Sequence, residues 1–271
     1  MNQPPVRISF DRVTVEFQTA GGPLKVIDDV SCDIRNCEFV SIIGPSGCGK
    51  TTMMNMVAGF VKPSGGTVLL DGKDVGGPGP ERGVIFQEYG VFPWLTVREN
   101  IGFGLKLAAN RALYSEREEI CERYMRLMGL IDFAQAYPKT LSGGMRQRLA
   151  IARAYAVKSE FLLMDEPFGA LDAQTRSNMQ DLLLEVLAAE RKTVMLITHS
   201  VEEAIYLSSR IVVVTARPAH IREIVDVPFP YPRNASLHEQ PEFGELRSHL
   251  RDLVMQEYAA QQRQARAAPI S

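Results

Sequence analysis

A glycine-rich stretch near residue 45 has the residue types and spacing that bind phosphate. The sequence GPSGCGKTT fits a pattern of glycine, any four residues, then Gly-Lys and Ser or Thr. In this pattern glycine N–H groups approach phosphate closely, the lysine neutralises charge and the hydroxyl reaches magnesium. The alternative is a glycine turn without a ligand. The predicted residues of this phosphate loop are Gly44, Pro45, Ser46, Gly47, Cys48, Gly49, Lys50, Thr51 and Thr52.

Two carboxylates further along the chain could activate water against a phosphate. Asp165 and Glu166 directly follow the apolar run 161–164. We expect Asp165 to hold magnesium through water and Glu166 to orient or deprotonate the attacking water. Taken alone, the pair could equally be the solvated end of a strand. Downstream of a phosphate loop, the catalytic interpretation is favoured.

Parallel strands must position these groups. The β-favouring run 39–43 precedes the phosphate loop, and a helical pattern begins at Lys50, so the loop is predicted to join a strand to a helix. The run 161–164 is typical of a strand buried on both faces. Open α/β sheets bind ligands at the carboxyl ends of their strands, which is where both groups occur.

A second stretch, TLSGGMRQRLAIARA at residues 140–154, also has the pattern of an anion site. Ser142 is a good helix N-cap, and Gly143 and Gly144 expose N–H groups near the positive end of the helix dipole. On its own, such a stretch is most often simply a capped helix. It has no lysine equivalent to Lys50, so its presence in a chain with a complete phosphate loop needs an explanation.

Composition excludes several classes of protein. The 271 residues are 45% hydrophobic and 23% charged, with a formal net charge of −2. This profile is typical of a globular protein and argues against nucleic acid as a partner. The four cysteines have neither disulfide-framework nor zinc spacing, which fits a reducing compartment. The sequence has no signal-peptide pattern and no membrane-spanning run, so any membrane role is expected to go through a partner.

At these motifs the chain resembles the nucleotide-binding subunit of ABC transporters, from about residue 6 to residue 220. The resemblance implies an α/β fold: a P-loop NTPase (RecA-like) core with a β-rich N-terminal part and a helical signature subdomain. It implies ATP and Mg²⁺ as ligands, and two subunits that sandwich two ATP molecules head to tail. Ser142, Gly143 and Gly144 of each subunit would then contact the γ-phosphate of the ATP held by Lys50 of the other, in a twofold dimer.

Other residues match family motifs one at a time. Gln87 matches the glutamine that senses magnesium and the reacting water, and it joins Thr51 and Asp165 as a predicted metal residue. His199 matches the switch histidine that bridges the γ-phosphate and the catalytic glutamate. Each of the two could otherwise be an ordinary polar residue at a strand end.

Two further matches and two departures complete the comparison with the family pattern. Asp172 matches the loop that touches the opposite subunit, and Phe17 is similar to the aromatic residue that stacks on adenine, although an inward strand phenylalanine is nearly as good an interpretation. Met145 stands where the family signature usually has glutamine, which leaves only the serine half of a capping box. Cys37 stands where the family commonly has glycine, without a physical reason in the sequence.

An aromatic segment after Gln87 is a candidate contact surface. It contains Tyr89, Phe92, Pro93 and Trp94. These residues could form the core of a small helical subdomain. Together they look like the groove that, in ABC importers, receives a short helix of the membrane subunit.

The predicted organisation is a single ABC ATPase domain. Residues 1–88 and 161–220 form the ATP-binding core, residues 89–160 the helical subdomain, and residues 221–271 an extension that ends in an amphipathic helix. The resemblance implies an ATP-hydrolysing subunit on the cytoplasmic face of the inner membrane, attached peripherally. Its partners would be a second ATPase subunit, two transmembrane permease subunits and, indirectly, an extracytoplasmic substrate-binding protein.

The stretches FQEYGVFPWLTVREN, LSGGMRQR and TARPAHI look most like the nitrate, sulfonate and taurine importer branch. An importer subunit for a different small solute is one alternative. A soluble ABC ATPase of DNA repair or translation is another, although those resembling chains carry a long coiled-coil insertion or two fused nucleotide domains. A P-loop kinase is a third, but it would have no use for the signature stretch or for His199.

Overall fold

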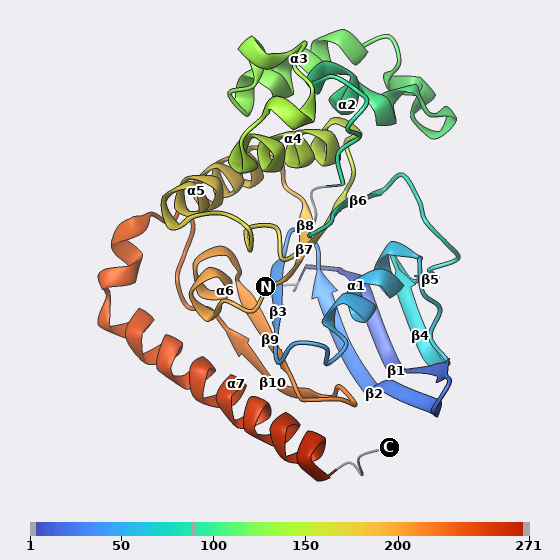
Figure 1. The fold of residues 1–271 in the computed structure, drawn as a ribbon, viewed down its shortest axis with the longest axis vertical. Coiled ribbons are helices and arrows are strands. Elements are labelled where there is room, and N and C mark those ends of the chain that lie inside the picture. The colour runs from blue at the N-terminus through green and yellow to red at the C-terminus, as the bar shows by residue number, and fades with distance from the viewer. Residues whose placement is uncertain (1–3, 88–89, 268–271) are drawn as a thin grey trace. The chain divides into compact units, whose positions relative to one another are not determined.

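The computed structural model describes residues 4–87 and 90–267. The chain forms two compact units (Figure 1). The first contains residues 1–78 and 193–271, and the second contains residues 79–192. The predicted functional limits at residues 88, 160 and 220 stay predictions.

The first unit contains an antiparallel sheet and a mainly parallel set of strands. The antiparallel sheet has the order β2-β1-β4-β5, and the second set has the order β10-β9-β3-β8, with β3 parallel to both β8 and β9. Every residue of β3, β8 and β9 is buried, as expected for parallel strands covered on both faces. The strands are β1 (Val6–Thr19), β2 (Gly22–Arg35), β3 (Phe39–Ile43), β4 (Gly65–Leu70), β5 (Lys73–Asp74), β8 (Thr193–Ile197), β9 (Arg210–Val214) and β10 (Ile221–Asp226).

The turn between β2 and β3 shows why the family commonly has glycine at the position of Cys37. Cys37 has a φ of 58°, in the left-handed region that glycine adopts without a steric penalty. A residue with a Cβ pays roughly 1 kcal/mol there, which accounts for the usual glycine. The Cys37 N–H donates to Thr193 Oγ1 at 3.1 Å, so the turn is held against the start of β8.

The helices of the first unit include a long C-terminal one. They are α1 (Lys50–Ala58), α6 (Val201–Leu207), the 3-10 turn η5 (Ala235–Glu239) and α7 (Pro241–Ala267). Helix α7 packs against α6 and β9 and runs beside them in Figure 1. Phe243 and Leu250 of its predicted apolar stripe are completely buried. Arg233 binds the C-terminal end of α6, because its Nη1 donates to the carbonyl oxygens of Ile205 and Tyr206 in the last turn of that helix.

The second unit consists of two parallel strands and a group of helices. Strands β6 (Arg82–Ile85) and β7 (Phe161–Asp165) pair directly. Helix α4 packs against α2, α3 and α5, and every described element between residues 90 and 160 is helical (Figure 1). The helices are α2 (Val97–Phe103), η1 (Gly104–Lys106), η2 (Ala108–Leu113), α3 (Arg117–Leu127), η3 (Ile131–Phe133), η4 (Pro138–Thr140), α4 (Gly143–Ala156) and α5 (Ala173–Ala189).

The α/β organisation predicted from the sequence is confirmed. Within residues 4–87 and 90–267, the structure contains no helix with the length and apolar character needed to cross a membrane.

Candidate active site

The phosphate loop joins β3 to α1, as its sequence predicted. Three of its residues must be glycine for geometric reasons. A Cβ at Gly44 would lie 2.7 Å from the carbonyl oxygen of Val214, which is too close for any side chain. Gly47 and Gly49 have φ angles of 72° and 122°, which L residues with side chains rarely adopt. The three glycines therefore let the backbone fold into a tight loop above the end of β3.

The N-terminus of α1 is built to accept an anion. No side chain caps this helix, and the same is true of α3, whereas Thr96, Ser142, Asp172 and Ser200 cap α2, α4, α5 and α6. Lys50 begins α1 and is 5% exposed, and its Nζ donates to the carbonyl oxygens of Gly44 and Pro45 at 2.9 and 2.8 Å. Backbone N–H groups, the helix dipole and a buried ammonium thus meet in one loop, a combination that fits a phosphate chain.

Cys48 is a buried residue of the phosphate loop. Its side chain is completely buried, and burial raises the pKa of its thiol above the ordinary value. The thiol is therefore neutral at physiological pH and serves as a small apolar residue beneath the loop.

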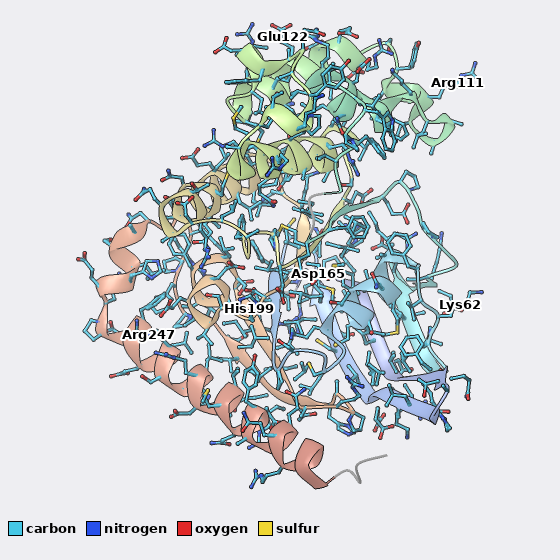
Figure 2. All side chains as sticks on the ribbon, in the orientation of Figure 1. Lys62, Arg111, Glu122, Asp165, His199 and Arg247 are labelled. Atoms are coloured by element: carbon cyan, nitrogen blue, oxygen red, sulfur yellow. The ribbon has the colours of Figure 1, made fainter. Side chains whose placement is uncertain are left out.

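The predicted catalytic carboxylate lies beside the predicted sensing glutamine in the second unit. Asp165 ends β7 and is 9% exposed; it is labelled in Figure 2. Glu166 follows with a φ of 45°, which turns the chain sharply at the strand end. Gln87 donates from Nε2 to Glu166 Oε2 at 3.3 Å. Two residues that are 79 positions apart in the sequence are therefore brought together.

The signature stretch forms the start of α4. Ser142 caps this helix, because its Oγ accepts a hydrogen bond from the N–H of Met145 at 3.3 Å. This is the serine half of a capping box, and Met145 supplies no reciprocal half. Gly144 packs so closely on α5 that a Cβ there would lie 2.6 Å from Thr175 Cγ2. Glycine at this position is thus required for the α4–α5 contact, whereas Ser142 stays exposed.

Asp172 caps α5 and so has a structural role of its own. Its carboxylate accepts a hydrogen bond from the N–H of Thr175 at 3.0 Å. Hydrogen bonds from Thr175 to the ionised carboxylate lower the pKa of Asp172 below its ordinary value. Thr175 therefore takes part both in the cap of α5 and in the contact between α4 and α5.

The remaining predicted residues of the first unit are accessible to a ligand. His199 is exposed and stands between the end of β8 and Ser200, the N-cap of α6 (Figure 2). Phe17 lies on β1 opposite Leu24 and is 40% exposed, so its ring is not part of the core. The roles of these side chains toward a nucleotide stay predictions.

A buried asparagine fixes the aromatic segment in the second unit. Asn100 accepts from the N–H of Phe92 at 2.8 Å and donates to the carbonyls of Phe92 and Leu95 at 3.0 and 2.9 Å. The Phe92 ring lies 5.5 Å from the ring of Trp94, which is 69% exposed. Tyr89, predicted to belong to this group, lies outside the described residues. Asn100 therefore holds residues 92–95 in place, and Trp94 presents an exposed aromatic side chain.

Arg153 of the signature helix contacts this aromatic segment. Its guanidinium lies 4.6 Å from the centre of the Phe92 ring, and its Nη1 donates to the carbonyl of Gly90. Burial lowers the pKa of Arg153, which nevertheless remains charged. Helix α4 and the aromatic segment are thus joined by one side chain.

Sequence reasoning missed two side chains that hold the phosphate loop from outside. Arg217, which follows β9, donates to the carbonyl of Gly47, and Gln261 of α7 donates to the carbonyl of Ser46. The stretch TARPAHI drew attention to Arg217 only as a mark of resemblance. Nothing in the α7 sequence distinguishes Gln261 from the glutamines beside it.

The sequence model described as "ABC transporter" matches residues 27–169. The chain belongs to the ABC transporter family. It is 53% identical to an ATP-binding protein of Brucella abortus, with 90% of this chain and 92% of that protein covered. It is 41% identical to the nitrate import ATP-binding protein of Synechococcus elongatus, with 93% of each chain covered, and 41% identical to the bicarbonate transport ATP-binding protein of the same organism, with 92% and 90% covered.

Solved structures agree with this assignment. The dimeric post-hydrolysis structure of the ATP-binding cassette MJ0796 with ADP and Pi superimposes with a TM-score of 0.70 at 29% identity, covering 82% of this chain and all of that one. The fold is therefore that of an ABC-type P-loop NTPase, and the chain is an ABC-type ATPase whose sequence resembles the nitrate-type branch.

The residues present also fit Mg²⁺ as the companion of ATP. Among the described residues there is no cluster of three acidic, histidine or cysteine side chains that could hold a metal by itself. Mg²⁺ in such enzymes is bound mainly by the substrate phosphates and water, with one or two protein groups. The hydroxyl of Thr51 and the carboxylate of Asp165 are oxygen donors of the kind that this ion prefers.

Proposed function

We propose that this ATPase drives the import of a small oxyanion such as nitrate, a sulfonate or taurine. The observation that carries the proposal is the 41% identity, over at least nine-tenths of both chains, to a nitrate import protein and a bicarbonate transport protein. Both solutes are small oxyanions. A homologous ATPase that matches both proteins along nearly its whole length is suited to drive the import of the same class of solute.

The proposed chemistry assigns one task to each side chain. Lys50 and the N–H groups of the phosphate loop bind the phosphate chain of ATP, and Phe17 stacks on the adenine. Glu166 orients or deprotonates the attacking water, Gln87 senses Mg²⁺ and that water, and His199 bridges the γ-phosphate and Glu166. Mg²⁺, held by Thr51, Asp165 and Gln87, would neutralise phosphate charge. The 3.3 Å hydrogen bond from Gln87 to Glu166 supports the proposal that these two residues act together on the attacking water.

The second anion site is explained if two copies of the chain cooperate. Ser142, Gly143 and Gly144 of one copy would complete the ATP site of the other, and Asp172 would touch the opposite subunit. The exposed Ser142 at the N-terminus of α4 supports this role. The dimeric MJ0796 cassette, with ADP and Pi bound, is a precedent in the same family.

The aromatic segment is the proposed contact with the permease. Trp94 is 69% exposed, Phe103 is 37% exposed, and the Phe92 ring lies 4.5 Å from the Phe103 ring. Buried hydrogen bonds of Asn100 keep the segment rigid, so an incoming helix of the membrane subunit would meet a preformed surface. Arg153 offers a direct connection from this surface to the signature helix. Membrane attachment at the cytoplasmic face then comes from the permease.

Uptake in the native cell tests the proposed cargo. We expect the Lys50→Ala variant, expressed at the wild-type level, to abolish uptake of one of four labelled solutes: nitrate, taurine, an alkanesulfonate or bicarbonate. Uptake of the other three should stay unchanged, which serves as the internal control. Equal uptake of all four in both strains would contradict the oxyanion proposal and favour another solute or a soluble ABC ATPase.

A further inference from the structure

Two side chains from distant parts of the first unit hold the outer carbonyls of the phosphate loop. Arg217 donates from Nε and Nη2 to the carbonyl oxygen of Gly47 at 3.2 and 2.9 Å. Gln261 donates from Nε2 to the carbonyl oxygen of Ser46 at 2.9 Å. Together with the two bonds from Lys50, they give a side-chain donor to each of four successive carbonyls, at residues 44–47.

The geometry of the peptide unit makes these contacts matter for a ligand. In a planar trans peptide, the C=O and the N–H of the following residue point in opposite directions. A donor that fixes the carbonyl of Ser46 therefore directs the N–H of Gly47 the opposite way. Fixing the carbonyl of Gly47 does the same for the N–H of Cys48. Glycines leave such a loop many alternative conformations, and each that turns an N–H away lowers the affinity for phosphate.

Both donors are anchored to the same framework. Glu257 is 7% exposed, and its carboxylate accepts the N–H of Ala216 at 3.1 Å, directly before Arg217. Gln261 lies four residues after Glu257, and residues four apart share one face of a helix. Helix α7 and the segment after β9 are thus bonded to each other next to the residues that contact the phosphate loop. The Ala219 N–H and carbonyl, bonded to Val26 and Asp28, fix the other end of that segment.

We propose that Arg217 and Gln261 are positioning residues that direct the N–H groups of Gly47 and Cys48 toward the phosphate chain of ATP. The proposal rests on the assignment of residues 44–52 as the ATP phosphate loop. Arg217 has the larger role, because it makes two charge-assisted hydrogen bonds to one oxygen and Gln261 makes one neutral bond.

Binding of inorganic tripolyphosphate, measured by calorimetry, isolates the phosphate contacts from those to adenine. We expect Arg217→Ala to raise the Kd roughly 10-fold and Gln261→Ala roughly 3-fold, as the loss of charged and neutral hydrogen bonds suggests. For ATP hydrolysis, KM should rise by similar factors while kcat stays within about 2-fold. Arg217→Lys keeps the positive charge and a single donor group, so it should recover only part of the affinity for tripolyphosphate.

Matched controls come from the same helix. Arg251→Ala removes an exposed arginine of α7 that lies ten residues before Gln261, and Gln262→Ala removes the exposed neighbour of Gln261. Both should bind tripolyphosphate as the wild type does, with melting temperatures near those of the test variants.

The outcomes separate this inference from the assignment on which it rests. Wild-type protein that binds neither ATP nor tripolyphosphate would overturn the assignment of the loop. Wild-type binding with Arg217→Ala indistinguishable from Arg251→Ala would overturn the positioning role.

Discussion

Replacing Glu166 with glutamine is expected to lower kcat for ATP hydrolysis at least 100-fold, about what general base catalysis contributes. The amide has nearly the shape of the carboxylate and can still accept the hydrogen bond that Gln87 donates to Glu166. It cannot take a proton from water. The Kd for ATP should therefore stay within about 3-fold of the wild-type value, because the lost interaction belongs to the transition state. Phosphate release and nucleotide binding, measured on the same preparation, check both values.

The control for this variant lies at the opposite end of the same strand. Glu160 precedes β7, is exposed, and is followed by the five buried residues that end at Asp165. Glu160→Gln removes an equal charge from the other side of β7 and should keep near wild-type activity. Glu166→Gln protein with more than a tenth of the wild-type kcat would show that another group activates the water.

Replacing Lys50 with alanine is expected to weaken ATP binding roughly 100-fold and to abolish hydrolysis at cellular ATP concentrations, since hydrogen bonds between charged groups are among the strongest in proteins. Lys50 is 5% exposed, and its Nζ donates to the carbonyl oxygens of Gly44 and Pro45 at 2.9 and 2.8 Å. Its ammonium is already inside the loop and so needs little reorganisation to meet a phosphate. Equilibrium binding of a fluorescent ATP analogue measures the change.

Two further variants separate binding from folding. Lys50→Met keeps most of the aliphatic length, so a loss of affinity equal to that of Lys50→Ala assigns the effect to the charge. Lys62→Ala removes an exposed lysine after α1, labelled in Figure 2, and should leave the affinity unchanged. Wild-type affinity in both Lys50 variants, with unchanged melting temperatures, would contradict the assignment of the phosphate loop.

The local elements could be predicted because their signals are local. Continuous β-favouring runs predicted β3 and β7, and the strand–loop–helix arrangement at Lys50 followed from glycine spacing. Ser142 was predicted as a helix cap from its residue type and is one in the structure. In each case the neighbouring residues determine the conformation, so a short stretch of sequence is sufficient.

The long-range contacts could not be predicted. Gln87 and Glu166 were each matched to a family motif, but their hydrogen bond depends on the pairing of β6 with β7. Arg217 and Gln261 reach the phosphate loop across 170 and 215 residues, and neither stands in a pattern that indicates such a contact. The role of Cys37 needed its φ angle, which residue type alone does not give.

We propose that ATP closes two copies of this chain head to tail. Sedimentation of Glu166→Gln protein with and without ATP tests this dimerisation most directly. We predict a monomer without nucleotide and a dimer with ATP. Adding Ser142→Arg should abolish the dimer, because a bulky cation replaces the exposed cap of α4, whereas Ser142→Thr keeps a capping hydroxyl and should retain it. A monomer that binds ATP in every variant, or a dimer that persists with Ser142→Arg, would contradict the account.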